Sequence, residues 1–362
     1  MSCQFRSSPL GWLFYALILS RPCWPQENAQ REWSESDVIQ RFLTLSPQAR
    51  ELRARVALTE AEAVTRTVYP NPSFAYSREG AGYNEFFEAS QTLPVNGRIR
   101  YLRQAGAAAV SEADANREAG LWSLRSDLRL AFYRIVAGQE RQRILSASIS
   151  DVEQLVRILR QREDEGEGSR YDRLRAEREV FELRTDFASV RSITPVAIAR
   201  LTGYLPEGTI IEQVRGDLRV PSEIPGTEDL IRRATNARAE YRAGQENIRR
   251  YQFEQQAASR LRIPEPQVTA GVKRADVISG TGPDPFSNVT RTGVAFGVLI
   301  PIPIFNTGRY EVARYQAQQE QANAQSAILS RQIRTEIEGA RGVLTTRMDA
   351  LVPNCTNKSI VS

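Results

Sequence analysis

The chain contains two copies of one pattern, and this internal duplication limits the folds that it can adopt. In each copy a helical pattern ends at Pro-x-Pro, two candidate strands follow, and a segment with Pro, Asn and Gly leads into another helical pattern. The first copy begins at Tyr69-Pro70-Asn71-Pro72 and the second at Ile263-Pro264-Glu265-Pro266. About 200 residues separate them, far more than the unit of a solenoid repeat. The pattern therefore predicts two related half-molecules.

Each copy is expected to supply one β-hairpin, over 72–95 and over 265–303. Phe74 and Tyr76 alternate with small residues in the first copy, and the alternation is stronger in the second, at Val294, Phe296, Val298 and Ile300. Strands of about ten residues have the length of a membrane-spanning barrel strand. Because a lone hairpin would leave backbone groups unpaired in lipid, several copies of the chain would have to complete a barrel. The alternative is that each hairpin caps a soluble helical bundle.

A very long helical pattern follows the first hairpin. Over 98–165 there is no proline, and apolar residues recur three and four positions apart. Such a helix would be roughly 100 Å long, and an uncapped helix of this length is typical of coiled coils. The pattern breaks at 166–172, where we expect Gly168 at the C-cap and Ser169 at the next N-cap. A long helical hairpin over 97–201 is the result.

The duplication divides the chain into two predicted repeats. The first, 34–226, would hold a helix with an N-cap signal at Ser34-Glu35-Ser36-Asp37, the first β-hairpin, the helical hairpin and an equatorial segment over 202–226. The second, 227–350, would hold a helix, the second β-hairpin and a long helix that starts at 308 and has no returning partner. Residues 351–362 lack a helical period, so we expect an aberrant tail on a C-terminally truncated repeat.

Composition argues against the commonest catalytic and metal sites. The 362 residues include no His, and the only cysteines are Cys3, Cys23 and Cys355. A Ser-His-Asp triad, a Cys-His dyad and the usual zinc sites are therefore absent. We expect no enzyme activity, no cofactor and no metal site, with a carboxylate enzyme as the weakest alternative. The net charge is only +5 and acidic residues alternate with Arg, so we expect no nucleic-acid partner.

Residues 1–25 have the features of a signal peptide. Arg6 precedes an apolar run of about ten residues, which is too short to span a bilayer and fits a secretory h-region. Cys23 invites a lipoprotein interpretation, but Ser20-Arg21-Pro22 is a poor lead-in to a lipidated cysteine. We therefore expect an exported protein, with a buried N-terminal helix as the alternative.

The order of these motifs resembles the TolC-like outer-membrane efflux protein family, the outer membrane factors. The matching segments are Tyr69-Pro70-Asn71-Pro72, Gly97-Arg98, 168–174, 199–203 and 301–306. Their order and spacing extend from about 34 to 348. The form Pro-Ile-Pro-Ile-Phe-Asn is most similar to the heavy-metal-efflux branch. The end of the chain departs from the family, because the second helical tip and the return helix are absent.

The resemblance implies a mainly α fold with a small β part. A long antiparallel α-helical coiled-coil barrel would join two β-hairpins, whose four strands contribute to a trimeric, twelve-stranded outer-membrane β-barrel. The homotrimer would contact outer-membrane lipid, extend into the periplasm, and work with a periplasmic membrane-fusion adaptor and an inner-membrane efflux transporter. It would passively conduct small molecules or metal ions. A non-functional truncated homologue and a periplasmic coiled-coil scaffold are the alternatives.

The same resemblance assigns roles to two sets of residues. The adaptor-contacting helical tip would comprise Gly166, Gly168, Ser169, Arg170 and Asp172. The barrel-to-helix junctions would be marked by Pro70, Pro72, Pro94, Gly97, Pro264, Pro266, Pro301, Pro303 and Gly308. Ordinary turn and cap chemistry is the alternative role for the tip residues, and the junction residues would be structural in either case.

Overall fold

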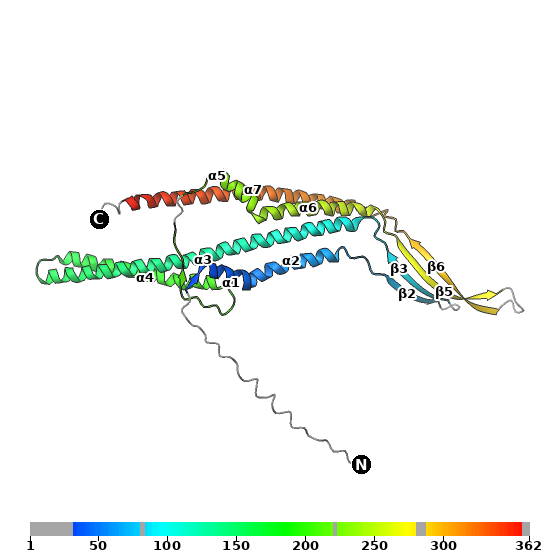
Figure 1. Ribbon diagram of the computed structural model, residues 1–362, viewed down its shortest axis with the longest axis horizontal. Helices are drawn as coiled ribbons and strands as arrows, with labels where there is room; N and C mark the ends of the chain where they lie inside the picture. Colours follow the sequence, from blue (N-terminus) through cyan, green and yellow to red (C-terminus); the bar gives the residue numbers. More distant parts are fainter. Residues whose placement is uncertain (1–31, 80–83, 220–222, 280–286, 357–362) are drawn as a thin grey trace, which may run out of the picture.

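The computed structural model describes residues 32–79, 84–219, 223–279 and 287–356. The molecule is elongated, with a β-sheet at one end and a long helical hairpin at the other (Figure 1). The expected signal peptide lies outside the described residues. The mainly α fold with a small β part is confirmed.

Four helices belong to the first repeat: α1 (Glu35–Leu45), α2 (Pro47–Thr65), α3 (Arg98–Asp164) and α4 (Arg170–Thr202). The predicted N-cap at Ser34 forms a capping box, in which the Asp37 N–H donates to Ser34 Oγ and the Ser34 N–H donates to Asp37 Oδ2, both at 3.3 Å. Pro47 begins α2, where its missing N–H costs nothing. The 67 residues of α3 form one helix, as their periodicity predicts.

The second repeat contains α5 (Thr227–Ala237), α6 (Ala239–Ser259), the short 3-10 helix η1 (Arg260–Arg262) and α7 (Arg309–Thr356). The single helix expected before the second Pro-x-Pro is instead divided at Arg238, whose ψ of 121° is extended. The helix expected to stop at 350 continues to Thr356, so the absence of helical structure predicted directly after 350 is wrong. A helix that is already formed gains one hydrogen bond per added residue and needs no apolar periodicity to continue.

The two predicted hairpins join into one antiparallel sheet of four strands, in the order β2-β3-β5-β6. Strands β2 (Ser73–Glu79) and β3 (Asn84–Thr92) form the first hairpin, and β5 (Gln267–Ser279) and β6 (Ser287–Leu299) form the second. The β3–β5 pairing joins the two repeats, with Ala89 opposite Ala270. The strands of the second hairpin are 13 residues long and those of the first are 7 and 9.

The main hydrophobic core lies in the helical part rather than at the sheet. It forms where α1, α3 and the end of α4 meet a two-residue parallel pairing of β1 (Trp33–Ser34) with β4 (Val214–Arg215). Its fully buried side chains are Val38, Phe42, Leu128, Phe132, Ile135 and Leu201. The strand pairing was missed from the sequence because two residues carry no periodicity. The core fixes the equatorial segment against the middle of α3.

Helix α3 packs against α2, α4 and α6, so it connects both repeats. Small residues permit a close approach of α2 to α3: a Cβ added to Gly106 would lie only 2.9 Å from Ala63 Cβ. None of the described helices contains a stretch that is both long enough and apolar enough to cross a bilayer.

Candidate membrane-facing sheet and helical tip

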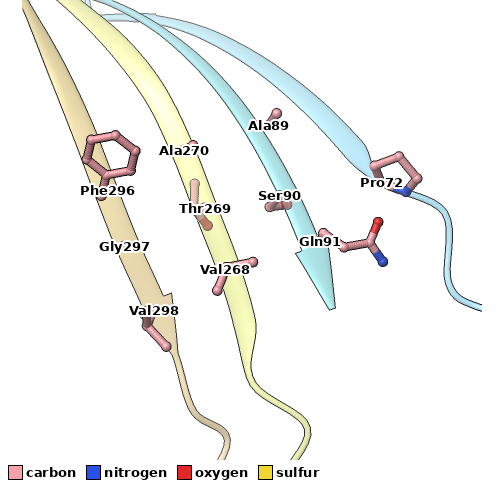
Figure 2. Close-up of a pocket in the computed structure, with 10 residues that line it drawn as sticks. All are labelled: Pro72, Ala89, Ser90, Gln91, Val268, Thr269, Ala270, Phe296, Gly297 and Val298. Carbon is pink, nitrogen blue, oxygen red and sulfur yellow. The ribbon is translucent and has the colours of Figure 1, made fainter. Parts of the chain in front are cut away.

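One face of the sheet is apolar along all four strands, and we call it the apolar face. Side chains alternate between the two faces of a strand, and the register places the following apolar residues on this face, with Gln91 as a polar one among them: Phe74, Tyr76, Phe87, Ala89, Val268, Ala270, Val272, Val294, Phe296 and Val298. Val268 and Ala270 lie beside Val298 and Phe296 across the β5–β6 pair (Figure 2). Phe296 is 82% exposed and Phe74 is 71% exposed, so these side chains are not covered by any of the residues that the structure describes.

The opposite face, called the polar face, carries Val289 and Leu299 near the two ends of β6 but otherwise mostly small or polar residues: Ser73, Ala75, Ser77, Glu88, Ser90, Thr92, Thr269, Gly271, Gly293, Ala295 and Gly297. Its one large ring, Phe86, lies under the Lys273 ammonium, with Nζ 4.8 Å from the ring centroid. An apolar exterior with a polar interior is the strand pattern of a transmembrane β-barrel.

A row of charges ends the apolar face toward the hairpin turns. Arg78 of β2 lies opposite Glu85 of β3, and Glu85 lies opposite Arg274 of β5. Opposite charges in directly paired positions stabilise neighbouring strands. Charged side chains are costly at the middle of a bilayer and cheap at its surface, so this row is suited to the boundary between hydrocarbon and water.

The outer edges of the sheet, on β2 and β6, pair with no strand of the described residues. Unpaired edges expose backbone N–H and C=O groups that can bond to another chain. Since the strands alternate in direction, β6 of one copy would pair antiparallel with β2 of the next. Within hydrocarbon these edges have to be closed, because no water is there to bond them.

The predicted junction residues lie in the segments that link the helices to the strands. The Leu93 N–H, next to Pro94, donates to the carbonyl of Pro266 at 2.8 Å. Gln91 Nε2 donates to the carbonyl of Pro70 at 2.8 Å. The hydrogen bonds thus connect the exit of the first hairpin both to its own entry and to the entry of the second.

Asn96 is a junction residue that the sequence reasoning did not select. It is 5% exposed, and its Nδ2 donates to Glu265 Oε1 at 2.9 Å, which ties the first repeat to the second. Its Oδ1 accepts the Arg98 N–H at 3.0 Å. The second junction repeats this turn, since Asn306 Oδ1 accepts the Gly308 N–H at 3.2 Å. The shared Asn before a Gly in both copies was the available signal.

Gly97 and Gly308 have left-handed backbones, with φ of 74° and 78°, directly before α3 and α7. Glycine adopts this conformation without the penalty that a Cβ brings. Gly97 has open space around it, whereas a Cβ on Gly308 would lie 2.6 Å from the Ala258 carbonyl oxygen. Gly308 therefore also permits α7 to pack closely on the end of α6.

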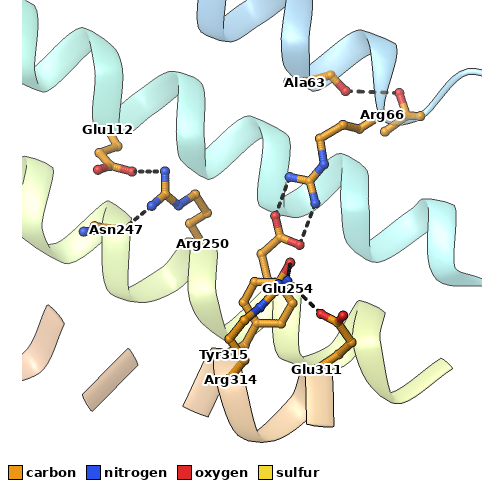
Figure 3. Close-up of polar contacts among 10 residues, drawn as sticks. Ala63, Arg66, Glu112, Asn247, Arg250, Glu254, Glu311, Arg314 and Tyr315 are labelled. Carbon is orange, nitrogen blue, oxygen red and sulfur yellow. Dashed lines mark hydrogen bonds and ion pairs between the residues drawn. The ribbon is translucent and has the colours of Figure 1, made fainter. Parts of the chain in front are cut away.

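An ion pair between a half-exposed arginine and a buried glutamate joins α2 to α6 (Figure 3). Arg66, at the end of α2, contacts both carboxylate oxygens of Glu254 on α6, at 2.5 and 2.8 Å. Glu254 is 4% exposed. The hydrogen bonds to Glu254, and to a smaller extent to Tyr315 of α7, raise the pKa of the Arg66 guanidinium. One bidentate contact thus joins helices of both repeats.

A second carboxylate in this region is less well compensated. Glu112 Oε2 on α3 lies 3.0 Å from Arg250 Nη1 on α6, but without hydrogen-bond geometry. Arg250 also donates to Asn247 Oδ1 at 2.9 Å (Figure 3). Burial raises the pKa of Glu112, and the charge of Arg250 opposes that change.

The predicted tip residues lie in and beside the turn of the α3–α4 hairpin, at the opposite end of the molecule from the sheet (Figure 1). Gly166, with φ of 79°, is the left-handed residue after the helix. The C-cap role predicted for Gly168 is therefore wrong. Gly168 instead allows close packing, since a Cβ there would lie 2.7 Å from the Glu163 nitrogen. Ser169 is the N-cap of α4, and its Oγ accepts the Tyr171 N–H at 3.2 Å.

Ion pairs behind the tip hold α3 and α4 together, and the sequence reasoning missed them. Arg173 contacts Glu163 at 2.6 Å and Glu177 at 2.8 Å, and Arg160 contacts Glu177 at 2.9 Å. Hydrogen bonds from Arg173 and then Arg160 lower the pKa of Glu177. In front of this network Tyr171 is 71% exposed, so the tip presents an aromatic side chain between Arg170 and Asp172.

The fold is similar to those of solved outer-membrane channels. The channel OprN is 18% identical with a TM-score of 0.66, over 88% of this chain and 76% of OprN. The MtrE channel of Neisseria gonorrhoeae is 17% identical with a TM-score of 0.60, over 87% of this chain and 73% of MtrE. The CmeC channel of Campylobacter jejuni is 13% identical with a TM-score of 0.62, over 90% of this chain and 74% of CmeC. The chain has the fold of these channels.

The fold expected from the family resemblance is thereby confirmed, whereas the heavy-metal-efflux branch stays a prediction. No protein-family model and no curated protein matches the sequence. Within the described residues of this channel fold, no group of three or more Asp, Glu or Cys side chains could hold a metal ion.

Proposed function

We propose that this protein is the outer-membrane channel of a tripartite efflux system. One observation carries the proposal: a four-stranded sheet with an apolar face, a polar face and two unpaired edges is connected directly to long helices. The arrangement suits a barrel built from several copies, with lipid outside and water inside. Three copies would give the twelve-stranded barrel of a homotrimer.

The proposed orientation places the sheet in the outer membrane and the helices in the periplasm. Helix α3 alone has 67 residues, which corresponds to roughly 100 Å at 1.5 Å per residue. The tip of the α3–α4 hairpin would then lie far from the outer membrane. There it would contact a periplasmic membrane-fusion adaptor that connects the channel to an inner-membrane efflux transporter.

The exposed side chains Arg170, Tyr171 and Asp172 are suited to that contact, because an exposed aromatic flanked by charges is a common composition of binding surfaces. The duct itself would conduct small molecules or metal ions passively. Energy for export would come from the transporter.

The two sheet faces provide a matched test of membrane insertion. Phe296 and Ala295 are neighbours on β6 but lie on opposite faces. Phe296→Arg should cost about 2–4 kcal/mol at the middle of the bilayer and reduce the amount of heat-modifiable trimer in outer-membrane fractions. Ala295→Arg, which would face the lumen, should leave the trimer in place. Equal effects of the two substitutions, or a wholly soluble periplasmic monomer, would contradict a membrane barrel and favour a coiled-coil scaffold.

Transport is tested by complementation. In a strain that lacks its own duct but retains adaptor and pump, the protein should restore resistance to the pump's substrates. Combined Arg170→Ala and Tyr171→Ala substitutions at the tip should abolish resistance without loss of trimer, while the exposed shaft variant Thr185→Ala should retain it. A stable outer-membrane trimer that restores no resistance with any cognate adaptor and pump would identify a non-functional homologue.

A further inference from the structure

A cavity of about 600 Å³ lies between the two repeats, bounded by α3 on one side and by α5, α6 and α7 on the other. It exists because α5 ends at Ala237, Arg238 is extended, and α6 starts in a new direction at Ala239. Small side chains line the bend and leave the space unfilled: Ala119, Ala234, Ala237 and Ala239. The cavity is separate from the sheet and from the helical tip.

The walls of this cavity suit an aromatic ligand. Leu121, Leu230 and Ile337 supply apolar surface, and Trp122 of α3 lines the cavity although its side chain is 65% exposed. Small-molecule sites typically have volumes of about 300–1,000 Å³, apolar walls and a few polar groups. A large aromatic side chain beside unfilled apolar space can gain contact area from a flat ring.

The charges around the cavity are mostly paired. Glu118 pairs with Arg242, Arg233 contacts Asp229 at 2.7 Å, and Arg238 contacts Glu336 at 2.7 Å. Two charged residues of the lining form no ion pair among the described residues. They are Arg125 on α3 and Glu240 on the opposite wall.

Arg125 lies three residues after Trp122, so both side chains share one face of α3. The charge of Arg125 contributes to lowering the pKa of Glu35, but that carboxylate already accepts hydrogen bonds from Arg129 and Tyr133, each at 2.6 Å. The Arg125 guanidinium is thus a cation that Glu35 does not need as a hydrogen-bond partner, and it lies on the same face of α3 as the Trp122 ring. A cation in this position favours an acidic group on the ligand.

We propose that this cavity binds a small aromatic molecule with one acidic group, its rings against Trp122 and its acid at Arg125. The site is independent of the proposed channel function, because it needs only the helical part of one copy.

Two fluorescent probes with one ring system isolate the two contacts. Anilinonaphthalene sulfonate is acidic, and N-phenylnaphthylamine is the same nucleus without the sulfonate. With the purified full-length protein in an uncharged detergent, both should show saturable energy transfer from tryptophan. Trp122→Phe should remove that transfer, which separates Trp122 from Trp12, Trp24 and the buried Trp33. Arg125→Gln should weaken binding of the sulfonate probe roughly fivefold and leave the affinity for the neutral probe unchanged.

Filling the cavity gives a second readout. Ala234→Phe, or Ala237→Phe if the first variant does not fold, should abolish binding of both probes while Trp122 emission remains. Ala199→Phe, at an exposed position of α4 outside the cavity, should bind both probes normally. The proposal is overturned if transfer rises linearly with probe in every variant, as micelle partitioning would give. It is also overturned if Arg125→Gln weakens both probes equally, or if Trp122 is shielded from acrylamide quenching in the assembled protein.

Discussion

At the scale of residues, Gly97 and Gly308 show how the same local conformation can have different costs of substitution. Both precede a long helix with a positive φ, but only Gly308 faces another backbone at close range. Gly97→Ala should therefore lower the free energy of unfolding by about 1 kcal/mol through backbone strain alone. Gly308→Ala should cost a further 1–3 kcal/mol or so, because α6 and α7 must separate.

Denaturant titration of the free energy of unfolding measures both effects. Gly339→Ala is the matched control, since Gly339 is in the middle of α7 with nothing within 4 Å of an added Cβ. It should stabilise the protein by about 1 kcal/mol, as Ala does in an open helix position. If Gly97→Ala and Gly308→Ala lowered the free energy of unfolding equally, the close approach of the Ala258 carbonyl to Gly308 would carry no additional cost.

Glu112 should make stability depend on pH in a direction unusual for a carboxylate. Its pKa is raised by burial, so the folded state holds the proton more tightly than the unfolded state. Its contribution to stability therefore increases as pH falls through the folded pKa and is complete below the unfolded value of about 4.3. The Gln variant should lack this dependence.

The measurement is the difference in unfolding free energy between the wild type and Glu112→Gln across the acidic range. That difference should shift in favour of the wild type as pH falls. Glu35→Gln is the opposite control: hydrogen bonding from Tyr133 foremost lowers the pKa of Glu35, so the wild-type advantage there should be lost as pH falls through the folded pKa. A wild-type advantage at Glu112 that declines on acidification would mean that Arg250 outweighs burial.

Single-residue roles were only partly predictable from sequence. Ser34 and Ser169 could be identified as N-caps because the cap residue is followed directly by a helical pattern. The sequence could not show whether Gly166 or Gly168 ends the helix in a left-handed conformation. Both lie in the same polar turn, and only the backbone path shows that the left-handed residue is Gly166. Asn96 was missed because its partner, Glu265, is remote in sequence.

At the scale of elements, the contact of Arg66 with Glu254 connects α2 to α6 and so joins the two repeats below the sheet. Arg66→Ala should lower the free energy of unfolding by about 1–3 kcal/mol. The buried Glu254 carboxylate loses its partner, but the Arg66 side chain is 46% exposed, so the loss is smaller than for a fully buried pair. Replacing both residues with Met should cost much less than the single change, since no buried charge then remains.

A double-mutant cycle on these two positions measures the coupling. The exposed pair Arg178–Glu182, with side chains 80% and 54% exposed, is the control, and Arg178→Ala should change stability by no more than about 0.5 kcal/mol. If Arg66→Ala were as mild as Arg178→Ala, water would have to reach Glu254, and the pair would not join the repeats.

Long elements were more predictable than the connections between them. The apolar periodicity of α3 and the alternation in β6 each extend over many consecutive residues, 67 in α3 and 13 in the strand β6. The division between α5 and α6 has no Pro or Gly at Arg238 to indicate it. The pairing of β1 with β4 is likewise set by the core around Trp33 and Val214 rather than by local sequence.

At the scale of the whole molecule, the duplicated pattern corresponds to two hairpins that share one sheet. The sequence indicates both hairpins, but it does not show that β3 pairs with β5, a pairing that accompanies the packing of α6 against α3. What closes the free edges of β2 and β6 is a matter of assembly. A channel made of three copies requires that β6 of each copy pair with β2 of the next.

Disulfide cross-linking between these edges tests that arrangement most directly. Ser77→Cys on β2 would be combined in turn with Gly293→Cys, Ala295→Cys and Gly297→Cys on β6, all on the polar face, in a background with Cys3→Ser, Cys23→Ser and Cys355→Ser. Each single-cysteine protein is a control. At one register, oxidation should produce a covalent dimer and then a closed trimer in outer-membrane fractions. Monomers at every register, from protein that is present in the outer membrane, would contradict a barrel closed between β6 and β2.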